Sequence, residues 1–86
     1  MTTYYYNNPT LARELHSSVI NKTKLNNRDV RYGNYHVLRE NRQNSALLEL
    51  GYLSNPTEEI LVTSQQYQQS VADGLFEGVA RYLKVF

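Results

Sequence analysis

The sequence contains no cysteine, which excludes disulfides and thiolate metal sites and leaves the cellular compartment open. No apolar run approaches the ~20 residues that a membrane-spanning helix needs. Residues 1–6 contain neither the basic start nor the apolar stretch of a secretory signal peptide, so we expect none in this chain. Internal repeats and low-complexity tracts are also absent.

Length and charge set further bounds. Eighty-six residues suggest one domain or part of one. An apolar fraction of 41% and a charged fraction of 20% are typical of a globular protein rather than a disordered one. Residues 22–42 carry six cations and two anions, so an anionic partner such as nucleic acid must be considered. Because there is no Gly-rich phosphate loop and no basic helix face, a solvated or locally paired basic surface is favoured and no nucleic-acid binding is expected.

The order of predicted elements is strand, helix, strand or strands, strand, helix, which indicates an α/β fold. Apolar patterning and capping residues predict strand 2–6, helix 9–22, strand 45–50, a short helix 56–62 and helix 65–84. Residues 30–32 and 35–38 also have strand character, and form either a short hairpin or one strand interrupted by a turn. The nearly continuous apolar run 45–50 predicts a strand buried on both faces in a parallel sheet.

Asn55 and Ser64 are expected as helix N-caps, with Glu58 completing a capping box. The last helix is expected to carry an apolar stripe of Tyr67, Val71, Leu75, Val79 and Tyr82 or Leu83. Gly74 and Gly78 favour close helix–sheet packing over a dimer motif.

One acid stands out in this apolar run. Glu49 lies within 46–53, which otherwise holds apolar residues and a glycine. Carboxyl groups are rarely buried without a partner, and desolvation moves their pKa towards the range useful for proton transfer at neutral pH. Active sites of open α/β sheets lie beyond the carboxyl ends of the strands, and we expect Glu49 to occupy that place. Glu49 at the end of a buried strand is therefore a catalytic candidate. The alternative is a structural ion pair with one of four arginines, Arg28, Arg31, Arg39 or Arg42.

Two segments, 37–41 and 46–55 (the latter reading Ala-Leu-Leu-Glu-Leu-Gly-Tyr-Leu-Ser-Asn), resemble the end of the zinc-dependent N-acetylmuramoyl-L-alanine amidases, the amidase-3 family. Residues 11–15, 27–30, 69–75 and 78–83 resemble other parts of the same half-domain. The resemblance implies a mostly parallel central sheet flanked by helices. It also implies hydrolysis of the amide between N-acetylmuramic acid and L-alanine in peptidoglycan, with zinc activating a water. The family's catalytic glutamate corresponds to Glu49, as a proton shuttle.

The chain departs from the family pattern in two local features. Asp29 stands where the family usually has glycine, and aspartate tolerates a positive φ better than most residues. Asn44-Ser45 stands where a proline usually precedes the strand, so we expect a freer loop there.

The larger departure concerns the metal. The family's zinc ligands, two histidines and a glutamate, lie in its first half, and this chain resembles only the second. A replacement site of His16, His36 and Glu49 has the right residue types, but the spacing gives it no support. We expect His16 on a helix surface and His36 half-buried on a strand with a hydrogen-bond partner. We therefore expect the chain to be the C-terminal portion of a catalytic domain and inactive alone.

Two further residues are candidates for binding substrate, because both are expected to flank strand ends on the side of Glu49. Arg39 could contact a stem-peptide carboxylate, or could simply balance Glu40 or Glu49. Asn55 could line the cleft, or serve only as the helix cap. Alternatives to an amidase portion are a non-catalytic module that binds peptidoglycan or a protein, and an unrelated α/β interaction protein. Surfaces left uncovered by a half-domain favour self-association.

Overall fold

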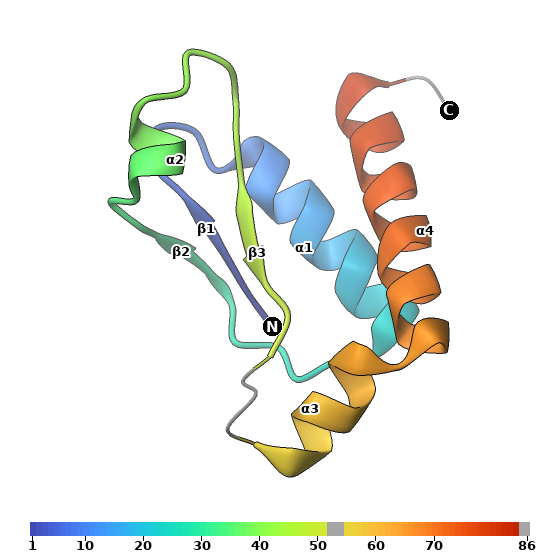
Figure 1. Ribbon diagram of the computed structural model, residues 1–86. Coiled ribbons are helices and arrows are strands. Elements are labelled where there is room, and N and C mark those ends of the chain that lie inside the picture. The colour runs from blue at the N-terminus through green and yellow to red at the C-terminus, as the bar shows by residue number, and fades with distance from the viewer. Residues whose placement is uncertain (52–54, 85–86) are drawn as a thin grey trace.

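The computed structural model describes residues 1–51 and 55–84, in which three short strands form a mixed sheet (Figure 1). The strands are β1 (Thr2–Tyr5), β2 (Val30–Tyr32) and β3 (Leu47–Glu49), in the spatial order β2-β1-β3. β1 pairs in parallel with β2 and antiparallel with β3. The α/β class is confirmed.

The expectation of a parallel, doubly buried strand at 45–50 is wrong, because β3 is antiparallel to β1 and only half-buried. The reason lies in the connections. Helix α1 (Thr10–Thr23) carries the chain back along the sheet between β1 and β2, which a parallel pair requires. Between β2 and β3 the only helix is α2 (His36–Arg39), which makes a single helical turn. This connection stays at the carboxyl end of β2 and does not cross the sheet (Figure 1). β3 therefore returns in the opposite direction.

Of residues 35–38, predicted as a strand, 36–38 instead lie in α2 and Tyr35 is the extended residue before its first turn. Leu38 is 2% exposed and anchors this turn, while Tyr35 packs its ring edge-on against Tyr4 with centroids 5.1 Å apart. Gly33 permits this approach, because a Cβ there would lie 2.6 Å from the Tyr35 ring. Burial of Leu38 and the ring contact of Tyr35 thus outweigh the local β propensity.

The two long helices, α1 and α4 (Gln65–Leu83), lie side by side against one face of the sheet (Figure 1). The predicted caps are confirmed: Asn55 accepts hydrogen bonds at the start of α3 (Pro56–Thr63), and Ser64 at the start of α4. Met1, Val19 and Leu25 form the buried core between helices and sheet. Within the described residues, no helix is both long and apolar enough to cross a bilayer.

Two glycines of α4 allow the long helices to touch. A Cβ on Gly74 would lie 2.8 Å from the Val19 Cα, and one on Gly78 would lie 3.2 Å from the Leu15 Cα. The Ser18 hydroxyl donates a hydrogen bond of 2.7 Å to the Gly74 carbonyl. Close packing at these glycines was predicted, but the expected partner was wrong: it is a helix and not the sheet.

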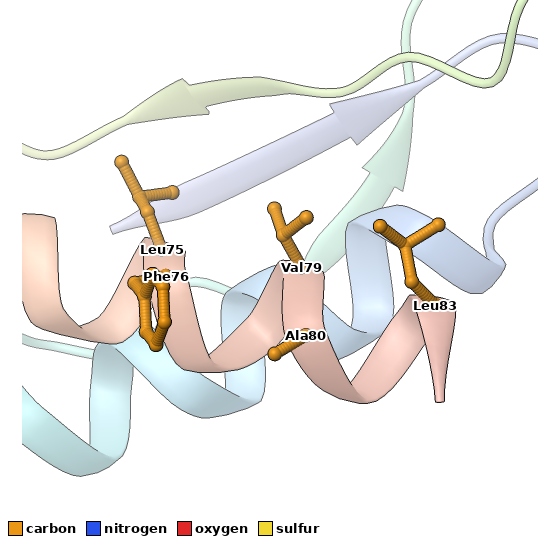
Figure 2. A pocket seen from close by; sticks show the side chains of 5 residues that line it. All are labelled: Leu75, Phe76, Val79, Ala80 and Leu83. Atoms are coloured by element: carbon orange, nitrogen blue, oxygen red, sulfur yellow. The ribbon is translucent and has the colours of Figure 1, made fainter. Parts of the chain in front are cut away.

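The apolar stripe predicted on α4 divides into two parts. Tyr67, Val71 and Leu75 pack against the core, as expected. Farther along, Val79 and Leu83 are 41% and 61% exposed. Figure 2 shows that Leu75, Val79 and Leu83 point to the same side of α4, where together with Phe76 and Ala80 they line a shallow apolar groove. The second half of the stripe is therefore uncovered within the described chain.

Candidate active site

Glu49 is the last residue of β3 and lies directly opposite Thr2 at the start of β1. Its neighbours Leu48 and Leu50 pack against the core on the side of the helices. Because successive side chains of a strand point to opposite faces, Glu49 points to the face away from α1 and α4. It is half-buried there.

The position of Glu49 in the sheet differs from the one expected. In an open parallel sheet, sites lie beyond the carboxyl ends of the strands. Since β3 is antiparallel to β1, its carboxyl end lies beside the amino ends of β1 and β2. The expectation that Glu49 lies at the shared carboxyl edge is therefore wrong, and the groups around it come from the segments that lead into the other two strands.

No arginine forms an ion pair with Glu49 in residues 1–51 and 55–84. Arg28 instead pairs with Glu58, with Nη2 and Oε1 2.5 Å apart. Arg39 pairs with Glu40 at 3.2 Å. Within this part of the chain, the structural ion pair that would explain Glu49 without catalysis is not formed.

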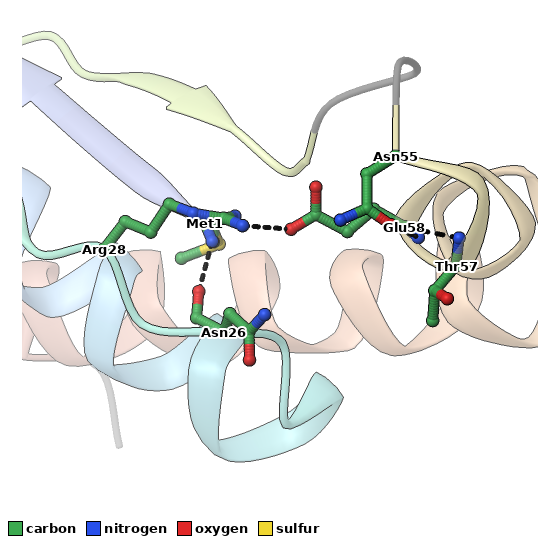
Figure 3. Close-up of polar contacts among 6 residues, drawn as sticks. All are labelled: Met1, Asn26, Arg28, Asn55, Thr57 and Glu58. Atoms are coloured by element: carbon green, nitrogen blue, oxygen red, sulfur yellow. Dashed lines mark hydrogen bonds and ion pairs between the residues drawn. The ribbon is translucent and has the colours of Figure 1, made fainter.

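A polar network lies beside the start of β1 (Figure 3). The Arg28 amide donates a hydrogen bond of 2.8 Å to the Met1 carbonyl, and the Met1 amino group donates to the Asn26 carbonyl. Burial, and then Arg28, lower the pKa of this amino group, while Glu58 and Glu49 act in the opposite direction. Glu49 therefore lies within electrostatic range of the same group as Arg28 and Glu58.

The sequence did not reveal the Arg28–Glu58 pair. Glu58 occupies the third position after the Asn55 cap and was interpreted only as part of a capping box. Its side chain is 7% exposed, which a solvated capping residue does not require. α3 is packed closely here, because a Cβ on Gly51 would lie 3.3 Å from the Glu58 Cβ. The available signal was an acid in the first turn of a helix and a cation 30 residues earlier, which is too weak to predict a contact.

The two proposed substrate-binding residues lie at different ends of the sheet. Asn55 is on the Glu49 side, and its side chain accepts hydrogen bonds of 3.1 and 3.2 Å from the amides of Thr57 and Glu58. Arg39 ends α2, beyond the carboxyl ends of β1 and β2 (Figure 1). The expectation that Arg39 flanks the same strand ends as Glu49 is therefore wrong. Arg39 donates to Glu40 and, at 2.6 Å, to Asn34.

Both expectations for the histidines are wrong. His16 is buried, because α1 turns it under the sheet, where Nδ1 and Nε2 each lie 2.8 Å from a partner oxygen, in Thr3 and Asn27 respectively. His36 is exposed at the start of α2.

Among the described residues, no three His, Cys, Asp or Glu side chains are grouped so as to hold a metal ion. Both ring nitrogens of His16 are occupied, and His36 lies at the opposite end of the sheet from Glu49. The residues present therefore do not fit the zinc site that the resemblance implies.

Comparison with known families decides the identity. A family model described as N-acetylmuramoyl-L-alanine amidase, Amidase_3, matches residues 1–81. The chain belongs to the Amidase_3 family. It is 46% identical over 74 residues to YrvJ of Bacillus subtilis, which is named as an N-acetylmuramoyl-L-alanine amidase. It is 39% identical over 84 residues to LytH of Staphylococcus epidermidis, which is named as a cell wall amidase. These matches cover 86% and 95% of this chain, but only 14% and 29% of the relatives.

Solved Amidase_3 structures agree with this fold. The chain superposes on the catalytic domain of CwlV, an N-acetylmuramoyl-L-alanine amidase from Bacillus (Paenibacillus) polymyxa, with a TM-score of 0.92 and 39% identity. The match covers 99% of this chain and 49% of that domain. An amidase from Clostridium difficile gives a TM-score of 0.90 with 32% identity, over 96% of this chain and 47% of the other. The chain thus spans about half of each solved structure.

The two local departures from the Amidase_3 pattern have structural accounts. Asp29 adopts φ of 70°, the left-handed conformation that favours glycine, and its amide bonds to Asn27 Oδ1 at 2.9 Å. The substitution is accommodated as predicted. Asn44, near the missing proline, donates a hydrogen bond to the Tyr82 hydroxyl on α4. The loop is thereby tied to a helix rather than freed. Residues 52–54, which complete the motif, lie outside the described residues.

Proposed function

We propose that this chain forms the C-terminal half of the catalytic domain of a peptidoglycan amidase. The reaction is hydrolysis of the amide between N-acetylmuramic acid and L-alanine, at the bacterial cell wall. The observation that carries the proposal is the superposition of 99% of the chain on 49% of an amidase catalytic domain, with a TM-score of 0.92. The name of LytH, a cell wall amidase, supports the same substrate and location.

Glu49 is the residue of this chain to which we assign catalysis. Its carboxylate takes a proton from the attacking water as the water oxygen bonds to the amide carbon. It returns that proton to the nitrogen as the carbon–nitrogen bond breaks. Three features suit this role: half-burial, the sheet face away from the two long helices, and no ion-pair partner among the described residues. Arg39 and Asn55 remain proposals for substrate binding, with Asn55 the better placed.

The chain's own residues do not fit a zinc site, so no step of this proposal runs through a metal. In the resemblance described above, the ligands belong to the half of the domain that this chain does not match. We accordingly propose that the 86-residue chain alone has no amidase turnover. Its contribution is the acid–base residue and the sheet that positions it.

A chimera tests the proposal. The CwlV domain is cut where its match to this chain begins, and this chain replaces the matched half. Because the two halves share the fold closely, the chimera is expected to hydrolyse purified peptidoglycan, measured as release of new amino termini. The 86-residue chain at the same concentration is the matched control and should release none. A folded chimera without turnover, or turnover by the chain alone, would contradict the proposal.

A second function is a non-catalytic module that retains the peptidoglycan surface. The absence of a three-ligand metal group among residues 1–51 and 55–84 favours it. Co-sedimentation of the 86-residue chain with purified cell walls tests it. Saturable binding by the chain, combined with an inactive chimera, would favour the module over the enzyme portion.

We also propose that the isolated chain self-associates. The groove on α4 exposes Phe76 by 72% and Leu83 by 61%, and β3 is an edge strand of the sheet. Uncovered apolar faces and strand edges favour pairing between copies. Light scattering over a range of concentrations should give a mass above 10.0 kDa that falls on dilution. The double variant Phe76→Ser, Leu83→Lys should shift the mass to the monomer. A monomer at all concentrations in the parent chain contradicts this prediction.

A further inference from the structure

Arg28 and Glu49 flank the start of β1 from opposite sides. The Arg28 amide bonds to the Met1 carbonyl, and Glu49 lies opposite Thr2 on β3. Neighbouring strands are about 4.8 Å apart, so the two backbones are separated by roughly 10 Å, much of which an arginine side chain can span. The site nevertheless keeps this cation away from Glu49. The Arg28 guanidinium is held instead by Glu58 at 2.5 Å (Figure 3).

Glu58 is fixed where it can do this. Its helix starts at the Asn55 cap, and its backbone amide is one of the two groups that Asn55 binds. The Glu58 side chain is only 7% exposed, and that of Arg28 is 28% exposed. A charge-assisted pair in such a partly desolvated position is stronger than a surface pair. Arg28 is therefore held by Glu58 in an ion pair.

We propose that Glu58 is a positioning residue that holds Arg28 in an ion pair and so leaves Glu49 without an arginine partner among the described residues. This inference rests on the proposed function for its meaning, because a proton shuttle must both accept and release a proton. A guanidinium bound to Glu49 would stabilise the carboxylate and make it a weaker base. Glu58 prevents that by occupying the guanidinium itself.

At this end of the sheet, the charges of Arg28, Glu58 and Glu49 all act on the Met1 amino group. On the other face of the sheet, α1 contributes His16, whose ring is bonded to Thr3 and Asn27. The Met1 amino group is the same in every variant of the 86-residue chain, and becomes a peptide nitrogen in the chimera. Changes between variants therefore report Arg28 and Glu58.

The direct test needs no enzymatic activity. NMR titration of the ¹³C-labelled Glu49 carboxyl in the 86-residue chain gives the pH midpoint of its protonation. In Glu58→Gln, Arg28 is released and the midpoint should fall by about 0.5–1 pH unit. In Arg28→Gln, the unpaired Glu58 charge should raise it by a similar amount. The double variant removes both charges, so its midpoint should return close to that of the parent chain.

A purely structural ion pair gives a different result. In that case the single variants lower the thermal midpoint, but they do not move the Glu49 titration midpoint in opposite directions. The double variant also does not restore the Glu49 midpoint of the parent chain. Either of these two titration results overturns the proposal. If Glu58→Gln does not fold, the other two variants still test the proposal. Arg28→Gln should raise the Glu49 midpoint, and the double variant should bring it back close to that of the parent chain. In the active chimera, the acid limb of kcat should move in the direction of the titration. Failure of the catalytic assignment is separate: Glu49→Gln would then retain turnover while the titration shifts persist.

Discussion

Replacing Glu49 by glutamine in the active chimera is expected to reduce kcat by about 10²–10⁴-fold, the usual contribution of a positioned acid–base group. Glutamine has nearly the shape of glutamate but can neither accept nor release a proton in this pH range. Glu49 ends β3 on the open face of the sheet and makes no ion pair among the described residues. The change should therefore leave the fold intact. Bound zinc should also be retained by the variant chimera. Peptidoglycan hydrolysis measures the loss of kcat, circular dichroism measures the fold, and zinc content measures the retained metal.

Glu59→Gln is the matched control, because it makes the same chemical change ten residues away on α3, where the side chain is exposed. It should retain the turnover of the parent chimera. If Glu49→Gln also keeps that turnover, Glu49 is a structural acid and the catalytic assignment is lost. If Glu49→Gln loses both turnover and bound zinc, the residue acts on the metal site rather than as a proton shuttle.

Local signals predicted the helices α1, α3 and α4 but not α2, and they predicted the starts of α3 and α4. Asn55-Pro56 and Ser64 mark the helix starts by themselves, since a cap satisfies amides within three residues of its own position. The direction of β3 could not be predicted in this way. An apolar run indicates a strand but says nothing about which neighbour it joins or how it runs. That depends on whether residues 33–46 cross the sheet, and they do not.

The site divides in the same manner. Glu49 was found because an acid in an apolar run is chemically unusual, whatever the fold. The sequence could not predict that Glu49 has no arginine partner among the described residues. Arg28 pairs with Glu58 because α3 packs beside Gly51, and this packing is a tertiary contact. His16 was misplaced for a related reason. Its two hydrogen bonds come from β1 and from the loop after α1, so its burial depends on tertiary packing.

Gly74→Val is expected to destabilise the chain by at least about 3 kcal/mol, at the upper end of overpacking costs. The added side chain would enter the space of the Val19 backbone, whose Cα would lie 2.8 Å from the new Cβ. A backbone cannot move aside by changing rotamer, so α1 and α4 must separate. That would also stretch the hydrogen bond from Ser18 to the Gly74 carbonyl. An 86-residue protein has a total stability of roughly 4–13 kcal/mol, so the midpoint of urea unfolding should fall sharply.

Ala72→Val is the matched control, because residue 72 is exposed on the same helix and the change introduces the same side chain. It should cost only a few tenths of a kcal/mol, from helix propensity. The Gly74→Ala variant then distinguishes helix propensity from the contact with Val19, because the two change the free energy of unfolding in opposite directions. Helix propensity alone would stabilise that variant by up to about 1 kcal/mol, whereas the contact with Val19 should make it less stable than the parent. A more stable Gly74→Ala variant would mean that α1 and α4 can move apart at little cost, and that the sheet carrying Glu49 does not depend on their close contact.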